Sequence, residues 1–298
     1  MTVVKRINEY HKFIISGILL VCMGIAFNVY SNRQSRNLFL SQQRADLIEI
    51  AGAADKNLEN ILSRVQNQIY YITTDLDFKR AEKNYIDNGT KYELWNLLRY
   101  NSLCESDLIS GIVVTKHGNV FLATKEEFLK NNFFYDSLGN YRMRLCKTHD
   151  GKYYMALGFK GNYEKLSYYA LIDLQQLYMK IADNETGSVN NIMLYNDKLD
   201  IIVASDYGII RTSRLMDFFF DGNESLGKYI KSESNSTEET AKVLDITDDG
   251  ERVGKKYVAV YPAGCNENRI FTLAVSTEYN RILEPLRSVN QNFLMSMA

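Results

Sequence analysis

The segment from Phe13 to Tyr30 contains no charged residue and consists mainly of large aliphatic side chains. As an α-helix rising about 1.5 Å per residue, it would extend about 27 Å, close to the thickness of a bilayer's hydrocarbon core. Tyr30 then lies where aromatic side chains favour the membrane interface. A cleaved signal peptide is the alternative, but residues 28–33 lack the two small residues of a cleavage site. We therefore predict a transmembrane helix at residues 13–30 that stays attached to the chain.

Basic residues flank this helix on both sides, so charge alone does not orient it. Three lysines or arginines lie within residues 5–12 and three arginines within residues 33–44. The positive-inside rule counts both groups. Residues 1–12 are too few to form a domain. The function of the chain must therefore reside in the residues that follow the predicted membrane helix.

Charge and cysteine content argue against several classes of protein. Lysine and arginine number 35 against 36 aspartates and glutamates, without a basic arm or an acidic tail, so we expect no nucleic-acid partner. The four cysteines form no C-x-x-C pair and only three histidines are present, so we expect no metal site and no cofactor. Outside the membrane helix one disulfide at most can form, and Cys104 with Cys146 is one candidate pair.

A long amphipathic stalk helix is predicted after the membrane segment, over residues 31–71, where the sequence contains one glycine and no proline. Its apolar stripe has two possible partners. It can pack on the chain's own domain, or it can form the seam of a parallel homodimer. Positions of the stripe recur every three or four residues at Leu47, Ala51, Ala54, Leu58, Ile61, Val65 and Ile69.

Beyond Tyr71 the sequence changes to short β-branched and aromatic runs separated by turn residues, which is typical of β-sheet. The pattern occurs twice. Predicted β-hairpins at residues 112–123 and 192–204 open the two copies. Each copy continues with a second hairpin, and residues 154–172 align without a gap with residues 257–275, 103 positions later. We therefore predict an α+β fold with two tandem antiparallel sheet domains.

Both copies end in helix signals. Residues 173–177 follow the last strand of the first copy as a short helix, and residues 277–283 do so in the second. We therefore predict a first sheet domain at residues 72–180 and a second at residues 181–280. The final residues, 281–298, turn apolar again and are predicted to form a helix leading to a second membrane span.

This order of elements, together with the strand-to-helix segment Ala170-Leu171-Ile172-Asp173-Leu174, resembles the double Cache sensor domains of bacterial receptors such as sensor histidine kinases and cyclic-dinucleotide signalling enzymes. The resemblance implies two PAS-like domains outside the cytoplasm, with residues 1–12 on the cytoplasmic side of the cell membrane. It implies that the first, membrane-distal domain binds a small molecule and that the stalk helix relays the signal. Any output domain would then lie beyond this chain.

Amino-acid-binding members of that family carry an R-x-W-Y motif and an aspartate at the end of the last strand. The best local match begins at Asn132 and keeps aromatic residues at Phe134 and Tyr135, while Asp173 matches the amine-binding aspartate. Asn132 stands where the motif has arginine. An asparagine cannot replace the bidentate, charge-assisted contact of arginine with a carboxylate. The match therefore argues against an ordinary amino acid as the ligand.

Other residues of the first copy complete the candidate ligand site. Arg142 and Arg144 can supply positive charge from a predicted loop at residues 138–145, although a solvated surface position is the alternative for both. Tyrosine is abundant, with 21 residues, and its ring and hydroxyl suit a selective small-molecule site. Alternation along a strand turns about half of these rings away from any one site. We select Tyr154 among them, next to Tyr135 and Asp173.

Two other functional classes compete with a sensor. An enzyme is not predicted, because no common catalytic motif is present and His117 and His149 fall in predicted turns. A membrane-anchored structural or protein-interaction module without a small-molecule ligand is the main alternative. A sensor requires a partly polar concave site in one sheet domain, whereas an interaction module requires an exposed apolar patch.

Overall fold

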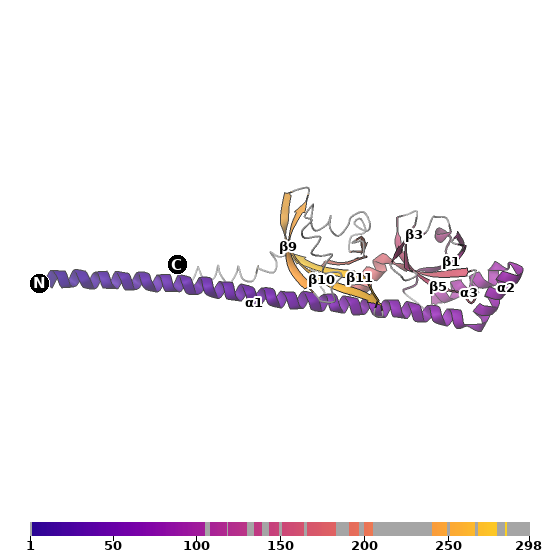
Figure 1. Cartoon of the computed structure of the whole chain (residues 1–298), viewed down its shortest axis with the longest axis horizontal. Helices are drawn as coiled ribbons and strands as arrows, with labels where there is room; N and C mark the ends of the chain where they lie inside the picture. The colour runs from indigo at the N-terminus through magenta and orange to yellow at the C-terminus, as the bar shows by residue number, and fades with distance from the viewer. Residues whose placement is uncertain are drawn as a thin grey trace. The chain divides into compact units, whose positions relative to one another are not determined.

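The structure is a computed structural model in which two antiparallel sheets follow a long helix along the chain (Figure 1). All statements below concern the residues that this structure describes. These are residues 2–104, 108–117, 119–129, 134–138, 143–148, 151–163, 166–182, 191–196, 200–204, 240–248, 251–265, 268–278 and 284.

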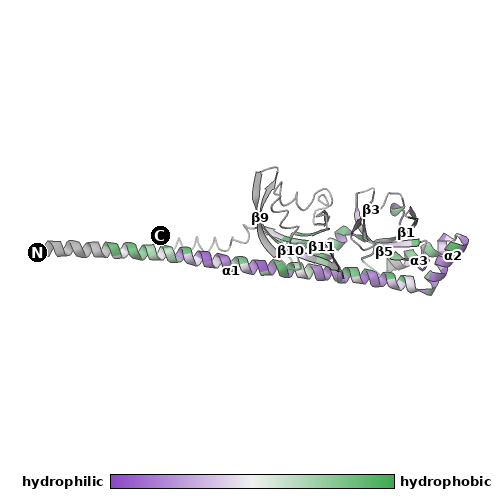
Figure 2. Ribbon diagram, viewed as in Figure 1, coloured by the Kyte–Doolittle hydropathy of each residue, from purple (hydrophilic) through white to green (hydrophobic). Residues whose placement is uncertain are grey.

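Helix α1 is continuous from Thr2 to Thr74, so the predicted membrane segment and the predicted stalk form one helix. After the end drawn in grey, the helix is coloured as hydrophobic, and the colouring becomes mixed further along (Figure 2). The side chains from Ile14 to Tyr30 include large apolar groups that are more than half exposed. Within the described chain, this is the one helix that is long and apolar enough to cross a membrane. The prediction of a long N-terminal apolar helix is confirmed.

The apolar stripe of α1 is buried inside the chain itself. Every predicted stripe position from Leu47 to Ile69 is at most 6% exposed. The first of the two predicted partners, the chain's own domain, is therefore confirmed for these positions. A homodimer formed through α1 would have to use other faces of the helix, because the chain's own residues already cover this one.

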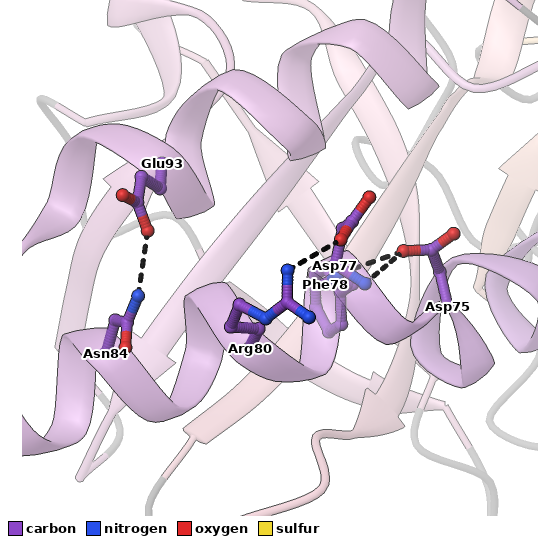
Figure 3. A network of polar contacts seen from close by, with 6 residues as sticks. All are labelled: Asp75, Asp77, Phe78, Arg80, Asn84 and Glu93. Carbon is purple, nitrogen blue, oxygen red and sulfur yellow. Dashed lines mark hydrogen bonds and ion pairs between the residues drawn. The ribbon is translucent and has the colours of Figure 1, made fainter.

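Two short helices follow α1, and a capping residue separates the first of them from α1. Asp75 accepts hydrogen bonds from the backbone N–H groups of Asp77 and Phe78 and starts α2 (Leu76–Asn88) (Figure 3). Gly89 ends α2 in the left-handed conformation, with φ of 73°. Helix α3 (Lys91–Cys104) packs beside α2. The two are joined by a bond of 3.0 Å from the Asn84 amide to the Glu93 carboxylate (Figure 3).

The first sheet, sheet A, has six antiparallel strands in the order β2-β1-β6-β5-β4-β3. Both hairpins predicted for the first copy are present. After the last strand, Asp173 caps helix α4 (Leu174–Ile181), which confirms the predicted exit helix. The strands are β1 (Gly111–Lys116), β2 (Asn119–Ala123), β3 (Phe134–Leu138), β4 (Met143–Lys147), β5 (Tyr153–Lys160) and β6 (Leu166–Asp173).

The second sheet, sheet B, has five strands in the order β8-β7-β11-β10-β9, which repeats the order of sheet A without its outermost strand. The predicted duplication is confirmed at the level of fold. Strand β11 runs to Glu278, so the helix predicted from Thr277 is wrong for its first two residues, and its remainder lies outside the described residues. The strands are β7 (Asn191–Tyr195), β8 (Ile201–Val203), β9 (Thr240–Asp248), β10 (Glu251–Cys265) and β11 (Asn268–Glu278).

The two copies differ by one residue in register, which the gapless sequence alignment does not reveal. Tyr154 pairs with Asp173 in sheet A, but Tyr257 pairs with Thr277 rather than with Ser276 in sheet B. The difference arises from a β-bulge between Ala263 and Cys265. Because a shift of one residue exchanges the two faces of a strand, Tyr154 has no tyrosine counterpart on the same face of sheet B.

Sheet A has two chemically distinct faces. One, the helix face, packs on α1 and α2: the Tyr168 ring contacts Phe78 edge-on at 5.4 Å, and its hydroxyl donates to Glu82 at 3.0 Å. The other, the site face, turns away from these helices and carries Tyr154 and Tyr169. Residues paired across antiparallel strands share a face, so the printed registers place every strand residue on one side or the other.

Candidate functional site

Three of the predicted ligand residues lie in one row across sheet A. The register pairs Phe134 with Cys146, Cys146 with Tyr154, and Tyr154 with Asp173, across strands β3, β4, β5 and β6. Paired residues in an antiparallel sheet project to the same side. The fold therefore brings Tyr154 and Asp173, which are apart in sequence, to the site face, with the backbone position of Phe134 in the same row.

Tyr154 is a buried part of this face, with 3% of its surface exposed. Phe128, from the 3₁₀ turn η1 (Glu126–Phe128), meets its ring edge-on at 5.3 Å. The aromatic pair anchors the turn that follows β2 on the site face. Together with Tyr154 and Phe128, the buried cluster contains Val113, Ala123, Cys146, Ala156, Tyr169 and Leu171.

Arg144 lies on the same face and is held by an aromatic ring. It belongs to β4, opposite Ala156, so the prediction of a loop through residues 138–145 is wrong for Leu138, which ends β3, and for Met143–Leu145. Its guanidinium carbon lies 5.5 Å from the centroid of the Tyr169 ring, and the residue is half-buried. A contact of this kind contributes about 0.5–2 kcal/mol. Arg144 therefore brings positive charge to the site face rather than standing free in solvent.

Asp173 ends β6 and also serves the helix that follows. Its Oδ1 atom accepts hydrogen bonds from the backbone N–H groups of Gln175 at 2.8 Å and Gln176 at 3.2 Å. An aspartate N-cap stabilises a helix by about 1 kcal/mol. The half-buried carboxylate is therefore held beside Tyr154 by its hydrogen bonds to α4, which form without a ligand.

Small residues occupy the centre of the site face on β5 and β1. Ala156 separates Tyr154 from Gly158 along β5, and Gly158 pairs with Tyr169. A side chain at Gly111 would come within 2.6 Å of the Phe128 ring, so β1 also requires a glycine where η1 approaches. The aromatic and charged side chains of the site face thus surround Ala156 and Gly158, which have small side chains or none.

The ligand roles of all the predicted site residues remain predictions, and not all of these residues have a described side chain. Asn132 and Arg142 lie outside the described residues, and Tyr135 is located only as a backbone position beside an irregularity in the β3–β4 pairing. Two contributors were missed by sequence reasoning, Tyr169 and Cys146. Tyr169 could have been found, because it lies four residues before Asp173 on the same strand and alternation puts both on one face.

Bond-forming chemistry is not favoured by the groups described on this face. Burial raises the pKa of the Cys146 thiol, although the nearby Arg144 charge lowers it, so the thiol stays protonated and is a poor nucleophile. Cys146 is also a free thiol, so the candidate disulfide with Cys104 does not form. No group of three or more histidine, cysteine or acidic residues able to hold a metal ion occurs among the described residues. Recognition of a small molecule suits this face better.

A cavity of about 240 Å³ between α1 and the helix face is the competing location. Its walls include Ile69, Tyr70, Leu157 and Phe159, with Gln66 and Thr73 as polar groups. Ligand sites for drug-sized molecules typically measure about 300–1,000 Å³ and contain convergent polar groups. This cavity is smaller and has no charged side chain in its walls, so the site face is the stronger candidate.

No family model matches the chain, and no curated protein matches it in sequence. Its structure is similar to solved sensory domains. The ligand-binding domain of the Pseudomonas aeruginosa PAO1 amino acid chemoreceptor PctB in complex with L-Arg aligns with a TM-score of 0.55 and 10% identity, over 82% of this chain and 98% of that one. The periplasmic sensory domain of the Campylobacter jejuni chemoreceptor Tlp1 aligns with a TM-score of 0.55 and 10% identity, over 83% and 99%. The chain therefore has the fold of Cache-type periplasmic sensor domains, which confirms at the level of fold the resemblance seen in its sequence.

Proposed function

We propose that this chain is the extracytoplasmic ligand-sensing region of a membrane-anchored bacterial receptor and that it binds a small molecule on the site face of sheet A. The observation that carries the proposal is the convergence of Arg144, Tyr154, Tyr169 and Asp173 on one face, away from α1. These residues come from strands β4, β5 and β6, and their side chains all project to the same side of the sheet. The fold-level similarity to chemoreceptor sensory domains supports the same assignment.

The charges on this face define the class of ligand. Arg144 suits an anionic group, and Asp173, which already accepts two backbone N–H groups, suits an amine or hydroxyl beside Tyr154. PctB, whose domain has been solved with L-Arg and with L-Gln, is named an amino acid chemoreceptor. In this chain Asn132 replaces the arginine of the family motif, so Arg144 would have to supply the positive charge from β4 instead.

Signal transfer is proposed to run through α1. The helix lies against the chain's own domains along its buried stripe and carries the apolar segment that we assign to the cell membrane. A ligand that shifts sheet A by a small displacement would move this helix, and a homodimer through the free faces of α1 would pass the movement on. The output domain would lie on the cytoplasmic side, beyond this chain, and the chain itself is proposed to have no enzymatic activity.

The test measures binding to the full chain held in lipid nanodiscs. Amino acids, organic acids, amines and sugars are screened by thermal shift, because a ligand that binds the folded state raises the melting temperature. A hit is then titrated against Asp173→Asn and Arg144→Gln. Asparagine is as good an N-cap as aspartate, so Asp173→Asn removes the charge while keeping α4.

We expect each variant to weaken binding at least 10-fold while changing the melting temperature of the ligand-free protein by only a few degrees, since a lost charge-assisted hydrogen bond is worth about 1.5–3 kcal/mol. Thr148→Val, a substitution at a buried polar residue beyond the end of β4, serves as the control and should leave binding unchanged. Binding that is equally strong in both charge variants would place the ligand elsewhere and refute the site.

An interaction module remains a second candidate because one apolar surface is exposed. Tyr70, Tyr71 and Leu76, around the junction of α1 with α2, are 65–76% exposed. Large exposed apolar side chains in a group mark surfaces that bind other proteins. If no compound in the panel shifts the melting temperature, and Tyr71→Ser with Leu76→Ser abolishes a crosslinked complex in cells, this alternative replaces the sensor.

A further inference from the structure

Sheet B carries three buried hydroxyl groups on the face that turns away from α1. Thr272 pairs with Tyr195 across β11 and β7, and Ser276 lies four residues further along β11, on the same side. The neighbouring residue Leu273 faces the other way and pairs with Tyr261, whose hydroxyl oxygen lies 3.7 Å from the position of a Cβ on Gly52 of α1. The hydroxyl-bearing face is therefore the counterpart of the site face of sheet A.

Two of these hydroxyls have no hydrogen-bond partner in the described structure. Tyr195 and Ser276 are 0% and 2% exposed, and the Tyr195 Oη and Ser276 Oγ atoms are both unpartnered. The Thr272 side chain lies near enough to lower the pKa of Tyr195, against the larger raising effect of burial, but the two hydroxyls do not meet hydrogen-bond geometry. Buried polar groups are nearly always paired, so an unpaired one requires a partner of another kind.

The internal duplication supplies an independent reason to expect a ligand here. Residues 169, 171 and 173 of β6 lie on the site face of sheet A, and residues 103 positions later lie on the corresponding face of sheet B. Ser276 thus occupies the place of Asp173, and Thr272 the place of Tyr169. The second copy has exchanged a carboxylate and a large ring for two small hydroxyl groups at matched positions.

We propose that this face of sheet B is a second small-molecule site, for an uncharged molecule that presents donors and acceptors at the edge of a flat apolar ring. The hydroxyls of Tyr195, Thr272 and Ser276 can each donate and accept. The area between the hydroxyls is apolar, while the register places the charged residues of this face, Lys242, Lys256 and Glu278, beyond Val258 and Ser276. That surface is formed by Met193, Val258, Val260 and Ala274, all at most 6% exposed. A nucleobase has this combination of an apolar ring face and a polar edge.

The duplication argument rests on the site proposed in sheet A, whereas the unpaired hydroxyls do not, and the test keeps the two sites apart. The full chain in nanodiscs is titrated with uracil and with hypoxanthine, using isothermal calorimetry and thermal shift. Tyr195→Phe and Ser276→Ala each remove one unpaired hydroxyl. Thr277→Val removes a buried hydroxyl from the opposite face of the same strand and serves as the matched control, while Arg144→Gln tests whether sheet A is involved.

We expect one of the two probes to bind, and Tyr195→Phe and Ser276→Ala each to weaken the Kd about 2- to 12-fold, the value of one neutral hydrogen bond. Thr277→Val and Arg144→Gln should leave it unchanged. Without probe, Tyr195→Phe and Ser276→Ala should melt no lower than the wild type, because the removed hydroxyls have no partner to lose. A lower melting temperature in the ligand-free variants would mean that both hydroxyls are already satisfied, and it would overturn the site. Binding of neither probe, or binding that survives both substitutions, overturns the proposal as well.

Discussion

Glu82 connects α2 to the β5–β6 hairpin and provides the most specific test of how sheet A is held to its helices. The residue is fully buried. Its Oε1 atom accepts from the Tyr168 hydroxyl at 3.0 Å, and its Oε2 atom accepts from the backbone N–H of Asn162 at 3.1 Å and from the Asn162 side-chain amide at 3.0 Å. The same amide also donates to the Thr73 carbonyl at 3.3 Å, at the end of α1.

Replacing Glu82 with leucine fills the position with an apolar side chain of similar size. It leaves the Tyr168 and Asn162 donors without their acceptor. The buried Tyr168 hydroxyl loses its bond to Glu82, at a cost of about 1–3 kcal/mol. Asn162 is exposed and can donate to water instead, so the loss of its hydrogen bonds to Glu82 adds about 0.5–1.5 kcal/mol. We expect Glu82→Leu to lower the free energy of unfolding by about 1.5–4.5 kcal/mol in total.

Glu82→Gln is the matched variant, because it keeps the shape and one accepting oxygen. The glutamine oxygen can accept from Asn162, while its NH₂ group can donate to the Tyr168 hydroxyl, which then acts as acceptor. We expect a loss of only about 0.5–1.5 kcal/mol. Urea unfolding can be followed through Trp95, the single tryptophan, whose indole N–H donates to the Ala123 carbonyl of sheet A at 3.1 Å. Equal losses for leucine and glutamine would refute the hydrogen-bond argument, and so would a leucine variant as stable as the wild type.

Two further predictions follow from the same contacts. Gly161→Ala should destabilise the fold by about 1–3 kcal/mol, because the new Cβ would overlap Glu82 Oε1 and come within 2.6 Å of the Tyr168 ring; an unchanged urea midpoint would contradict this. Burial raises the pKa values of Cys146, Tyr168 and Tyr195 above their ordinary values of 9.0, 10.0 and 10.0, and the Glu82 carboxylate raises that of Tyr168 further. The folded state therefore binds these protons more tightly than the unfolded state, so their contribution to stability is complete below about pH 9 and is lost as the pH rises beyond it. Tyr168→Phe should reduce the alkaline slope of the unfolding free energy by up to about 1.4 kcal/mol per pH unit, and an unchanged slope between pH 10 and 11 would show that Tyr168 does not titrate in the unfolded state as assumed.

Local patterns in the sequence predict the helices and the inner strands well, because each pattern depends only on residues within the same segment. The three- and four-residue spacing from Leu47 to Ile69 marks the buried stripe of α1, and runs of β-branched and aromatic residues mark β1, β6 and β11. Asp173 was selected because it matches the aspartate that ends the last strand in the family the sequence resembles, and the same place makes it the cap of α4. Elements whose identity depends on a distant partner were harder to predict. Strand β4 pairs with β5 on one side and with β3 on the other, and its first three residues were predicted to lie in a loop.

The site itself could be predicted only in part, for the same reason. Nothing near Glu82 in the sequence indicates a buried carboxylate, because its partners lie 80 and 86 residues away. The role of Arg144 depends on the Tyr169 ring, which arrives from another strand. The alignment of the two copies misplaced Tyr154 against Tyr257 because a bulge changes register without changing sequence length. Tyr168 and Tyr169 nevertheless face opposite sides of β6, as the alternation of side chains along a strand requires.

That opposition gives a physical route from the site face to α1. Tyr169 supports Arg144 on the site face, and its neighbour Tyr168 donates to Glu82 on the helix face, so one short stretch of β6 is held from both sides. We hypothesise that a ligand displacing Tyr169 also displaces the backbone of Tyr168, and with it the contacts of Glu82 and Asn162 to the end of α1. Hydrogen exchange of residues 66–74 should then change when a ligand binds, and Glu82→Gln should reduce the change without abolishing binding. If exchange at the end of α1 is the same with and without ligand, the signal does not leave sheet A by this route.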